Sequence, residues 1–485
     1  MRVAALLLLW LAASAVGWNL SLNNDVSWQY WVARQLIGGA RFYTDITESN
    51  PPLWFWEAVP VTWAADRLHV AARHLAVALV MAQTMLAIGL VGALSPGKAL
   101  WRSAGATLIL LTLPLFDFGE RDHLMAIGAL PYVLLAARRV EGRLVDRRIA
   151  IVVAALAAAG FALKPHFLVV PIAIEAWVAL RLGKGWRIVR PETATVAAIL
   201  VLYALAVAIL TPAYFTHQLP LVLSAYGEFK PPFARVWTQQ IYLPCWIVGA
   251  AALILARQRS AATASAGVAA MAFAAVYTMQ GKGFPYHALP VTIGVAWACW
   301  LLLERERRLA PRLLAIAAIG GALLTAALVG PFKPSRIDPI TARIEALPPG
   351  ATYALISTHS WDAFPLIEDR RLIWPMRGFL LWTMPAIARD PSSPIAATTR
   401  REIAQDLWCH PPDAILFDDP ARSPAMPRNG FDYRRFVLGD PSARALLANY
   451  RLTDRVGGAT LWTRTSPLAP RGSDCRAISI RPDYR

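Results

Sequence analysis

The segment DFGERDHLM, residues 117–125, places carboxylates, a guanidinium and an imidazole within seven positions, between two apolar runs. Such groups can accept a proton, hold a phosphate or stabilise a developing charge. Each charged residue at the centre of a bilayer costs about 2.5–3.5 kcal/mol, so this cluster facing lipid would oppose insertion by roughly 10 kcal/mol. We therefore expect it to lie at a water interface or in a cavity lined by protein.

Polar residues of the same kinds recur at the ends of other apolar runs, in segments 23–25, 45–50, 164–166, 211–240 and 282–287. If these segments meet at one membrane face, they form a cavity of carboxylates, cations and aromatic rings, the composition of a site for an anionic, hydroxyl-bearing substrate. The candidate catalytic residues are Asp25, Glu120 and Asp122. The candidate substrate-binding residues are Asn50, Arg121, His123, Lys164, Lys282, Tyr286 and His287.

A structural role competes with the chemical one for several polar residues. Charged residues beside a span often only anchor it at the interface, and Lys164 fits that role equally well. Glu228, Lys230 and Arg235 lie in a long loop, where a solvated face is expected. Glu175, inside a span, is expected to be a hydrogen-bonded residue of the helix bundle rather than a catalytic one.

Three histidines, His123, His166 and His287, raise the question of a metal ion. No pair of them has the spacing of zinc ligands, so we expect them to make hydrogen bonds. The three candidate catalytic carboxylates could instead hold a divalent cation, and the sequence leaves the need for one open.

The composition is that of a membrane protein with many spans. Of the 485 residues, 56% are hydrophobic and 16% are charged, and the mean hydropathy is +0.43. A soluble chain of this length would carry more charge. The formal charge of +17 could indicate a nucleic-acid partner, but Lys and Arg also accumulate in the cytoplasmic loops of membrane proteins. The positions of the charges distinguish these two explanations.

Eleven apolar stretches are expected to be transmembrane helices. They lie at about 3–20, 74–94, 103–117, 122–137, 149–163, 165–180, 192–210, 241–256, 263–279, 285–303 and 312–329. The loops that join them are alternately rich and poor in Arg. The Arg-rich loops hold 18 of the 27 basic residues before position 330, so the positive-inside rule makes them cytoplasmic. The other loops, which hold 9 of the 15 acidic residues and the candidate site, then face outward, and no nucleic acid is needed to explain the charge.

The N-terminal region combines a span with a long external loop. Arg2 and the apolar run after it resemble a cleavable signal peptide, but the run continues through Trp18 and Leu20, which favours a retained signal anchor. In the loop, residues 26–37 and 51–68 are rich in tryptophan. We expect both to be helices lying in the interface, because a full span at 51–68 would turn the Arg-rich loops outward.

From about residue 331 the composition changes to that of a soluble domain, with 21 basic and 16 acidic residues in 155. The patterns predict buried strands at 352–358 and 413–419, helices at 398–408 and 440–450, and a terminal hairpin at 450–464. We therefore predict two parts: an all-α polytopic membrane domain over 1–330 and a small external α/β domain over 331–485.

Two of the four cysteines, Cys409 and Cys475, lie in the C-terminal part. Export to an oxidising compartment permits a disulfide between them, provided that the two thiols are close enough in space. The sequence leaves that distance open.

The order of motifs in the first external loop resembles the GT-C glycosyltransferase superfamily. The motifs are Asp25, then WQYWVARQLIGGARFYTD, then NPPLWFW. They look most like the bacterial branch related to the lipid A aminoarabinose and galacturonic acid transferases and to the protein mannosyltransferases. In that pattern a second acidic residue follows in the next external loop, where this chain has Glu120 and Asp122. The resemblance is strong over 20–125, weaker to 330, and does not extend to the C-terminal part.

The resemblance implies transfer of a sugar from a polyprenyl-phosphate carrier to an acceptor hydroxyl or amine at the external face. It matches Asp25 to the base that activates the acceptor. The leaving phosphate needs fixed cations, and Arg121 is the best candidate because its guanidinium can hold a phosphate through two bonds. Nearby carboxylates could stabilise a transition state that resembles an oxocarbenium ion.

One position departs from the family pattern. Many relatives carry Lys before Pro-Pro-Leu, where this chain has Asn50, so the phosphate cation supplied there is missing. Lys164, Lys282 and Arg121 are the candidates to replace it.

The sequence thus predicts an inverting, polyprenyl-phosphate-dependent glycosyltransferase of the bacterial inner membrane, with its active site and C-terminal domain in the periplasm. Its expected partners are a polyprenyl-phosphate-sugar donor, a lipid or glycan acceptor and membrane lipids. The main alternative is a transporter or flippase of a lipid-linked sugar, which should show midplane charges or broken spans in corresponding halves. An inactive scaffold that binds a partner through its C-terminal domain is a third hypothesis. The gathering of polar residues at one face favours the enzyme.

Overall fold

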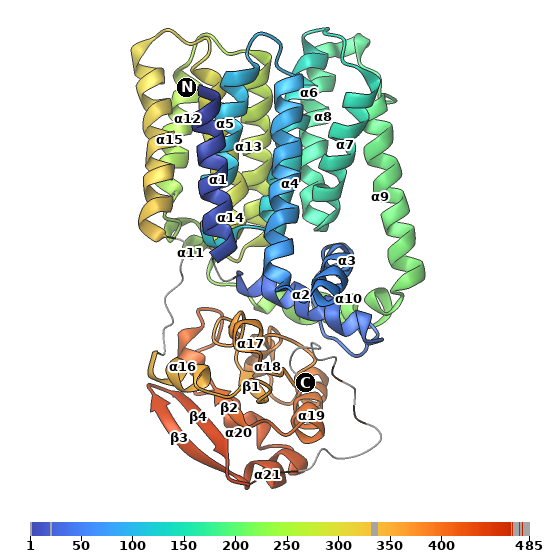
Figure 1. The fold of residues 1–485 in the computed structure, drawn as a ribbon, viewed down its shortest axis with the longest axis vertical. Coiled ribbons are helices and arrows are strands. Elements are labelled where there is room, and N and C mark those ends of the chain that lie inside the picture. The colour runs from blue at the N-terminus through green and yellow to red at the C-terminus, as the bar shows by residue number, and fades with distance from the viewer. Residues whose placement is uncertain are drawn as a thin grey trace.

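A bundle of long helices forms the larger part of the molecule, and a smaller domain with a β-sheet lies at one end of it (Figure 1). The computed structural model describes residues 2–19, 22–330 and 338–466, together with 468, 475 and 478. Eleven helices coincide with the predicted apolar stretches. They are α1 (Arg2–Asn19), α4 (Ala72–Ala93), α5 (Ala99–Thr112), α6 (Arg121–Val140), α7 (Arg147–Ala162), α8 (Val169–Leu182), α9 (Pro191–Leu210), α12 (Leu243–Leu255), α13 (Ala261–Gln280), α14 (Pro285–Leu302) and α15 (Leu309–Val329).

Within the described residues, seven of these helices are long and apolar enough to cross a membrane. They are α4, α6, α8 with the short turns before and after it, α9, α13, α14 and α15. Three of the other four are shorter: α5, with 14 residues, rises only about 21 Å, against a hydrocarbon core of about 30 Å. The architecture is that of a multi-pass membrane protein, as predicted.

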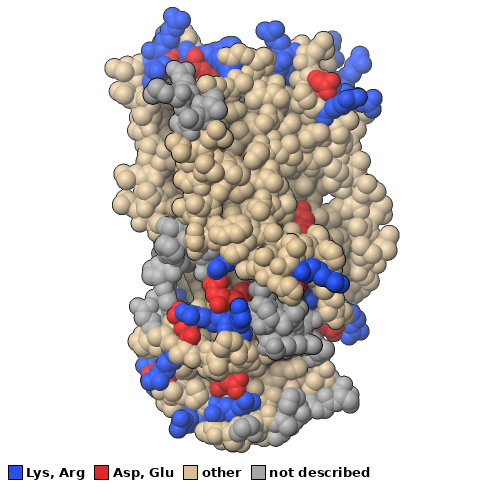
Figure 2. All heavy atoms as spheres, viewed as in Figure 1, with Lys and Arg blue, Asp and Glu red and all other residues tan. Residues whose placement is uncertain are grey.

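The end of the bundle farthest from the C-terminal domain is rich in basic residues. Figure 2 shows Lys and Arg side chains gathered there, above a belt of helices with few charges. Several acidic residues at this end are held in ion pairs, such as Glu192 with Arg139 at 2.9 Å. Glu175 pairs with Arg190 and accepts a hydrogen bond from the Tyr132 hydroxyl at 3.2 Å. Glu175 therefore has the hydrogen-bonded role in the bundle that the sequence predicts.

Two helices lie across the opposite end of the bundle, beside the C-terminal domain (Figure 1). α2 (Asn24–Ile37) and α3 (Leu53–Leu68) match the two predicted interfacial segments. The surroundings of α2 differ from those expected of an interfacial helix, because every residue from 25 to 35 is buried. The C-terminal domain covers its outer side, where the Trp28 ring stacks on Phe379 with centroids 5.1 Å apart.

Ion pairs also connect this end of the bundle to the C-terminal domain. The buried Arg34 guanidinium of α2 lies 2.7 Å from Glu368 and 3.5 Å from Asp66 of α3. Arg73 of α4 lies 3.3 Å from Asp369. Helix α2 is thus held between the two parts of the chain. The short helices α10 (Leu219–Ala225) and α11 (Phe233–Thr238) belong to the chain between α9 and α12.

The C-terminal domain is built on a four-stranded sheet of order β1-β2-β4-β3. β1 (Tyr353–Ile356) is parallel to β2 (Ala414–Phe417), and β4 (Ala459–Arg464) is antiparallel to both β2 and β3 (Tyr450–Val456). The helices of this domain are α16 (Asp338–Glu345), α17 (Leu366–Asp369), α18 (Met384–Arg389), α19 (Pro394–Cys409), α20 (Tyr433–Val437) and α21 (Pro441–Leu447). The two strands and the hairpin lie within the predicted ranges.

Helix α19 begins four residues before the predicted start. Ser393 caps it by accepting a hydrogen bond from the Ala396 amide at 3.3 Å, and Pro394 occupies the first turn, where its missing amide proton costs nothing. At its other end Cys409 is bonded to Cys475, with Cα atoms 5.4 Å apart. The disulfide that the sequence left open is therefore formed.

Candidate functional site

A cavity of about 350 Å³ lies where the bundle, α2 and the C-terminal domain meet. Seven of the ten predicted site residues line it: Asp25, Asn50, Arg121, Lys164, Lys282, Tyr286 and His287. The other three, Glu120, Asp122 and His123, are fully buried beside it at the start of α6 and do not line it. Segments far apart in the sequence are thus brought together, as predicted for a single cavity.

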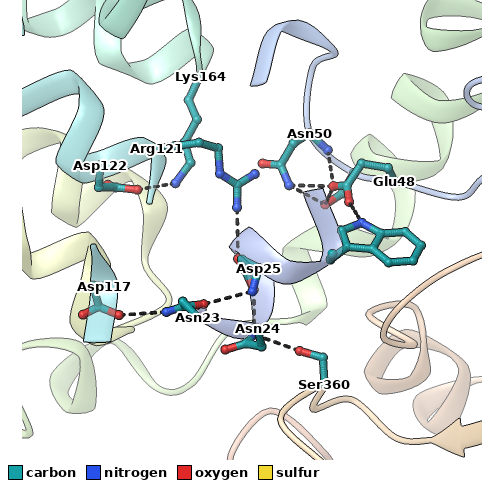
Figure 3. Close-up of polar contacts among 12 residues, drawn as sticks. Asn23, Asn24, Asp25, Glu48, Asn50, Asp117, Arg121, Asp122, Lys164 and Ser360 are labelled. Carbon is teal, nitrogen blue, oxygen red and sulfur yellow. Dashed lines mark hydrogen bonds and ion pairs between the residues drawn. The ribbon is translucent and has the colours of Figure 1, made fainter. Parts of the chain in front are cut away.

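Asp25 occupies the first turn of α2, where the helix dipole stabilises its negative charge. The Asn23 side chain caps this helix by accepting a hydrogen bond from the Asp25 amide at 2.9 Å, and it donates to Asp117 at 3.0 Å. Carboxylate Oδ1 accepts from Asn24 Nδ2 at 2.7 Å, and Oδ2 lies 3.0 Å from Arg121 Nη2 (Figure 3). The carboxylate is therefore fixed in position and holds a different partner on each oxygen.

Arg121 is the first residue of α6, and the chain reaches it through a tight turn. Gly119 has φ +86°, in the left-handed region that favours glycine. The guanidinium lies over the Trp54 ring, 4.4 Å from its centroid. Its Nε and Nη1 atoms are buried and have no hydrogen-bond partner among the described residues. Because a buried N–H group without a partner is costly, these two donors are suited to an anion in the cavity.

Asp122 forms a second ion pair behind the cavity wall. Its Oδ2 atom lies 2.6 Å from Lys164 Nζ, and its Oδ1 atom accepts a hydrogen bond from Gln280 at 3.2 Å. Lys164 also donates to Gln280 Oε1 at 3.0 Å. Because the Lys164 ammonium already contacts Asp122 and Gln280, it is less suited than Arg121 to bind a substrate anion.

Glu48, which is not among the predicted site residues, is buried near Arg121. It accepts hydrogen bonds from Trp28 Nε1 at 2.8 Å and from the side chain of Asn50 at 2.6 Å (Figure 3). Burial raises the pKa of its carboxyl, against the lowering effect of Arg121 and these hydrogen bonds. Asn50 is thus oriented by Glu48. In the sequence Glu48 belongs to the polar segment 45–50 expected at this face, but no role in the site was predicted for it.

Glu120 occupies the N-cap position of α6 without a capping hydrogen bond from its side chain, and it is completely buried. Both of its carboxyl oxygens are without a hydrogen-bond partner in the described part of the chain. Burial and the nearby Asp25 carboxylate raise the pKa of Glu120 well above its usual range. Both effects favour the neutral form of Glu120 next to the ion pair of Asp25 and Arg121.

Lys282 lies in a loop between two glycines, Gly281 and Gly283, whose φ values of +59° and +69° are left-handed. Its ammonium donates to the backbone carbonyls of Tyr226, at 3.1 Å, and Phe229. Lys230 lines the same cavity. Burial, with the neighbouring Lys230 ammonium, lowers the pKa of Lys282 to about 6. Neither Lys282 nor Lys230 has a carboxylate partner among the residues that the structure describes, so both lysines favour an anionic ligand here.

The predicted histidines differ in placement. His123 points into the protein: its Nε2 lies 3.1 Å from the Leu110 carbonyl and its Nδ1 accepts a hydrogen bond from Gly119 at 3.2 Å. His287 lines the cavity beside Tyr286, with ring centroids 4.3 Å apart. Because His123 does not contact the cavity, the structure does not support its predicted role in substrate binding.

A wall of the cavity comes from the C-terminal domain, which sequence reasoning did not include in the site. Its residues are Thr358, His359, Ser360, Trp361, Phe379, Leu380 and Trp382. Nothing in the sequence pairs these residues with segments more than 300 positions earlier, so only the folded chain reveals them.

The carboxylates of the site do not fit a metal-binding set. In the ranges that the structure describes, no three His, Cys, Asp or Glu side chains gather closely enough to hold a metal ion. Asp25 and Asp122 each face a cation instead.

Comparison with solved structures identifies the fold. A crystal structure of ArnT from Cupriavidus metallidurans bound to undecaprenyl phosphate superposes with a TM-score of 0.55 at 13% identity, over 95% of this chain and 97% of ArnT. The apo structure of the same protein gives 0.52 and 15%, over 95% and 96%. The chain has the ArnT fold. No family model matches the sequence, and no curated protein sequence matches it.

The ArnT fold extends over nearly the whole chain, the C-terminal domain included. This confirms the predicted fold class, a helical multi-pass membrane protein with a small C-terminal sheet domain. The cavity described above is therefore part of an ArnT-like fold.

Proposed function

We propose that the protein is an integral membrane glycosyltransferase that moves a sugar from a polyprenyl-phosphate carrier to a cell-envelope acceptor at the periplasmic face. The ion pair of Asp25 and Arg121 at the cavity carries the proposal, because it places a base next to an incompletely paired cation. The ArnT structure bound to undecaprenyl phosphate supports a carrier of this kind.

Asp25 is the base. Its carboxylate lines the cavity and is held on both sides, so it can accept the proton of an acceptor hydroxyl without moving. As the proton passes to Asp25, the acceptor oxygen bonds to the anomeric carbon, and the bond from that carbon to the phosphate oxygen breaks. A single displacement of this kind inverts the anomeric centre.

Arg121 and Lys282 receive the phosphate. The electron pair of the broken bond passes to the leaving phosphate, whose charge is stabilised by fixed donors. Arg121 offers Nε and Nη1, and Lys282 is an ammonium that now rests on two backbone carbonyls. Arg121 and Lys282 thus replace the phosphate-binding lysine that the family pattern has at the position of Asn50. Lys164 remains paired with Asp122.

The charge distribution supports a periplasmic cavity. The basic residues gather at the other end of the bundle (Figure 2), and short basic loops remain in the cytoplasm. The cavity and the C-terminal domain then face the periplasm of a bacterial inner membrane.

Transfer by the purified full-length protein tests the proposal. A panel of undecaprenyl-phosphate-linked hexoses and pentoses is supplied with extracted cell-envelope glycolipids and glycans, and new glycosides are detected by mass spectrometry. We expect transfer from at least one donor by the wild type and loss of it in Asp25→Asn. Movement of the donor across proteoliposomes without a new glycosidic bond would instead make the protein a transporter.

A further inference from the structure

The loop after β1, residues 358–361, forms the part of the cavity wall closest to the start of α2. Thr358, His359, Ser360 and Trp361 all line the cavity. Ser360 Oγ accepts a hydrogen bond from Asn24 Nδ2 at 2.8 Å, as Figure 3 shows. The C-terminal domain therefore reaches the immediate neighbourhood of the candidate base.

This loop is braced from behind. Ser357 Oγ donates to Asp418 at 2.6 Å and accepts from the His359 amide at 2.8 Å. Arg422 joins Asp418, at 2.7 Å, to Asp362, at 3.2 Å. The loop 358–361 follows the carboxyl end of β1, and the segment 418–422 follows that of the parallel strand β2, at the edge where parallel sheets bind ligands. The loop is thus a fixed surface suited to positioning a ligand.

The two oxygens of Asp25 separate two sides of the site. Oδ2 faces Arg121 at 3.0 Å, on the side of the membrane helices. Oδ1 faces Asn24 at 2.7 Å, and the same Asn24 amide contacts Ser360. In the proposed reaction the leaving phosphate lies beside Arg121. The acceptor hydroxyl, which gives its proton to Asp25, then lies on the opposite side, along the loop 358–361.

The chemistry of the loop differs from that of the helix side. The helix side presents the cations Arg121, Lys164 and Lys282, whereas residues 358–361 carry no carboxylate, lysine or arginine. They present two rings, of His359 and Trp361, with centroids 5.6 Å apart and planes tilted by 55°. The hydroxyls of Thr358 and Ser360 lie beside them and contact Tyr433 at 3.2 Å and Asn24 at 2.8 Å. An indole face packs against the apolar C–H face of a pyranose, while hydroxyls and imidazole bond to its hydroxyl groups.

We infer that the loop 358–361 binds a saccharide ring of the acceptor, with Trp361 as its platform and one sugar hydroxyl directed at Asp25. The inference rests on the proposed function, which requires an acceptor next to the base. It makes the acceptor an uncharged sugar at the point of attachment, not a phosphate or a lipid amine. The C-terminal domain then selects the acceptor, and the membrane helices select the donor.

Saturation-transfer NMR on the purified full-length protein tests this site with a panel of methyl glycosides of glucose, galactose, mannose and N-acetylglucosamine. At least one glycoside should receive saturation, and Trp361→Ala should weaken its binding by about fivefold or more, the value of an aromatic contact. Trp361→Phe should keep part of the binding. Trp63→Ala is the matched control, since Trp63 is 54% exposed on α3 and outside the cavity. Equal binding by Trp361→Ala and wild type would overturn the inference.

Competition distinguishes the acceptor sugar from the donor sugar. Saturating undecaprenyl phosphate should leave glycoside binding in place, whereas displacement would put the sugar on the donor side and overturn the assignment. Binding of undecaprenyl phosphate should be unchanged by Trp361→Ala and weakened by Arg121→Lys. If the wild type binds glycosides through Trp361 but transfers no sugar from any donor, the proposed function fails while the saccharide site stands.

Discussion

The two ends of the helix bundle use the same residue types in different ways. At the Arg-rich end, both oxygens of Glu192 receive hydrogen bonds from Arg139, at 2.9 and 3.0 Å. Both oxygens of Glu304 likewise receive bonds from Arg102, at 2.7 and 2.9 Å. These buried carboxylates are paired with a complete guanidinium fork, which is the arrangement of a structural contact.

At the cavity end the pairing is incomplete. Arg121 meets Asp25 through Nη2 alone, and its Nε and Nη1 atoms lack hydrogen-bond partners within the described ranges. Glu120, next to it in the chain, has two such oxygens. Buried ion pairs are therefore not in themselves evidence of a site, because they also fasten helices. Polar atoms left unpaired beside a cavity are the informative feature.

The largest difference between the two ends should be their accessibility from outside the cell. In a background without the free cysteines Cys245 and Cys299, Ser224→Cys at the cavity end should react with an impermeant maleimide in intact spheroplasts. Arg143→Cys and Lys184→Cys, exposed at the Arg-rich end, should react only after permeabilisation. The reverse pattern would contradict the periplasmic placement of the cavity.

Removal of a carboxylate should affect turnover at one end only. Asp25→Asn keeps the shape but removes the base, so turnover should fall by about 10²-fold or more, the scale of general-base catalysis. The matched control Glu192→Gln breaks the ion pair in which both carboxylate oxygens accept from Arg139, so it should lower thermal stability. Turnover of the folded variant should stay within about twofold of the wild type. Turnover near wild type in folded Asp25→Asn would remove Asp25 from the chemistry.

Arginine forks should differ in the same way. Arg121→Lys keeps the charge but loses the free N–H pair, so the KM for the donor should rise about tenfold, the value of one charge-assisted hydrogen bond. Arg139→Lys at the Arg-rich end should leave the donor KM unchanged. Steady-state kinetics on both purified variants would show the contrast, and an equal effect of the two substitutions would count against a phosphate site at Arg121.

The smallest effect is a pH dependence at Lys282. Burial and Lys230 lower the pKa of Lys282 to about 6, so an anion that binds there must raise this pKa and take up a proton. Affinity for undecaprenyl phosphate should therefore fall as the pH rises above about 6. Lys282→Arg stays charged, so the affinity of the wild type relative to this variant should fall about fivefold or more between about pH 6 and pH 8. Titration of both by native mass spectrometry measures the ratio, and a constant ratio would exclude Lys282 from the phosphate contact.

Much of the fold follows from local patterns. Charged residues are costly in lipid, so the uncharged runs had to be the helices and the polar clusters their ends. The apolar runs at 352–358 and 413–419, bounded by turn residues, contain β1 and β2. The burial of α2 on all sides was not predictable, because the cover on its outer face comes from Phe379, more than 300 residues later.

The sequence by itself determined which residue types reach the cavity end: a carboxylate at Asp25 and both signs of charge in 120–123. Only the tertiary structure decided which of them face the cavity. Successive residues of a helix point about 100° apart, so Arg121 reaches the cavity, Asp122 turns to Lys164 and His123 turns inward to Leu110. The contact of Asn24 with Ser360 joins positions 336 residues apart. Local patterns contain no information on such a pair, because it forms only when the two parts of the chain pack together.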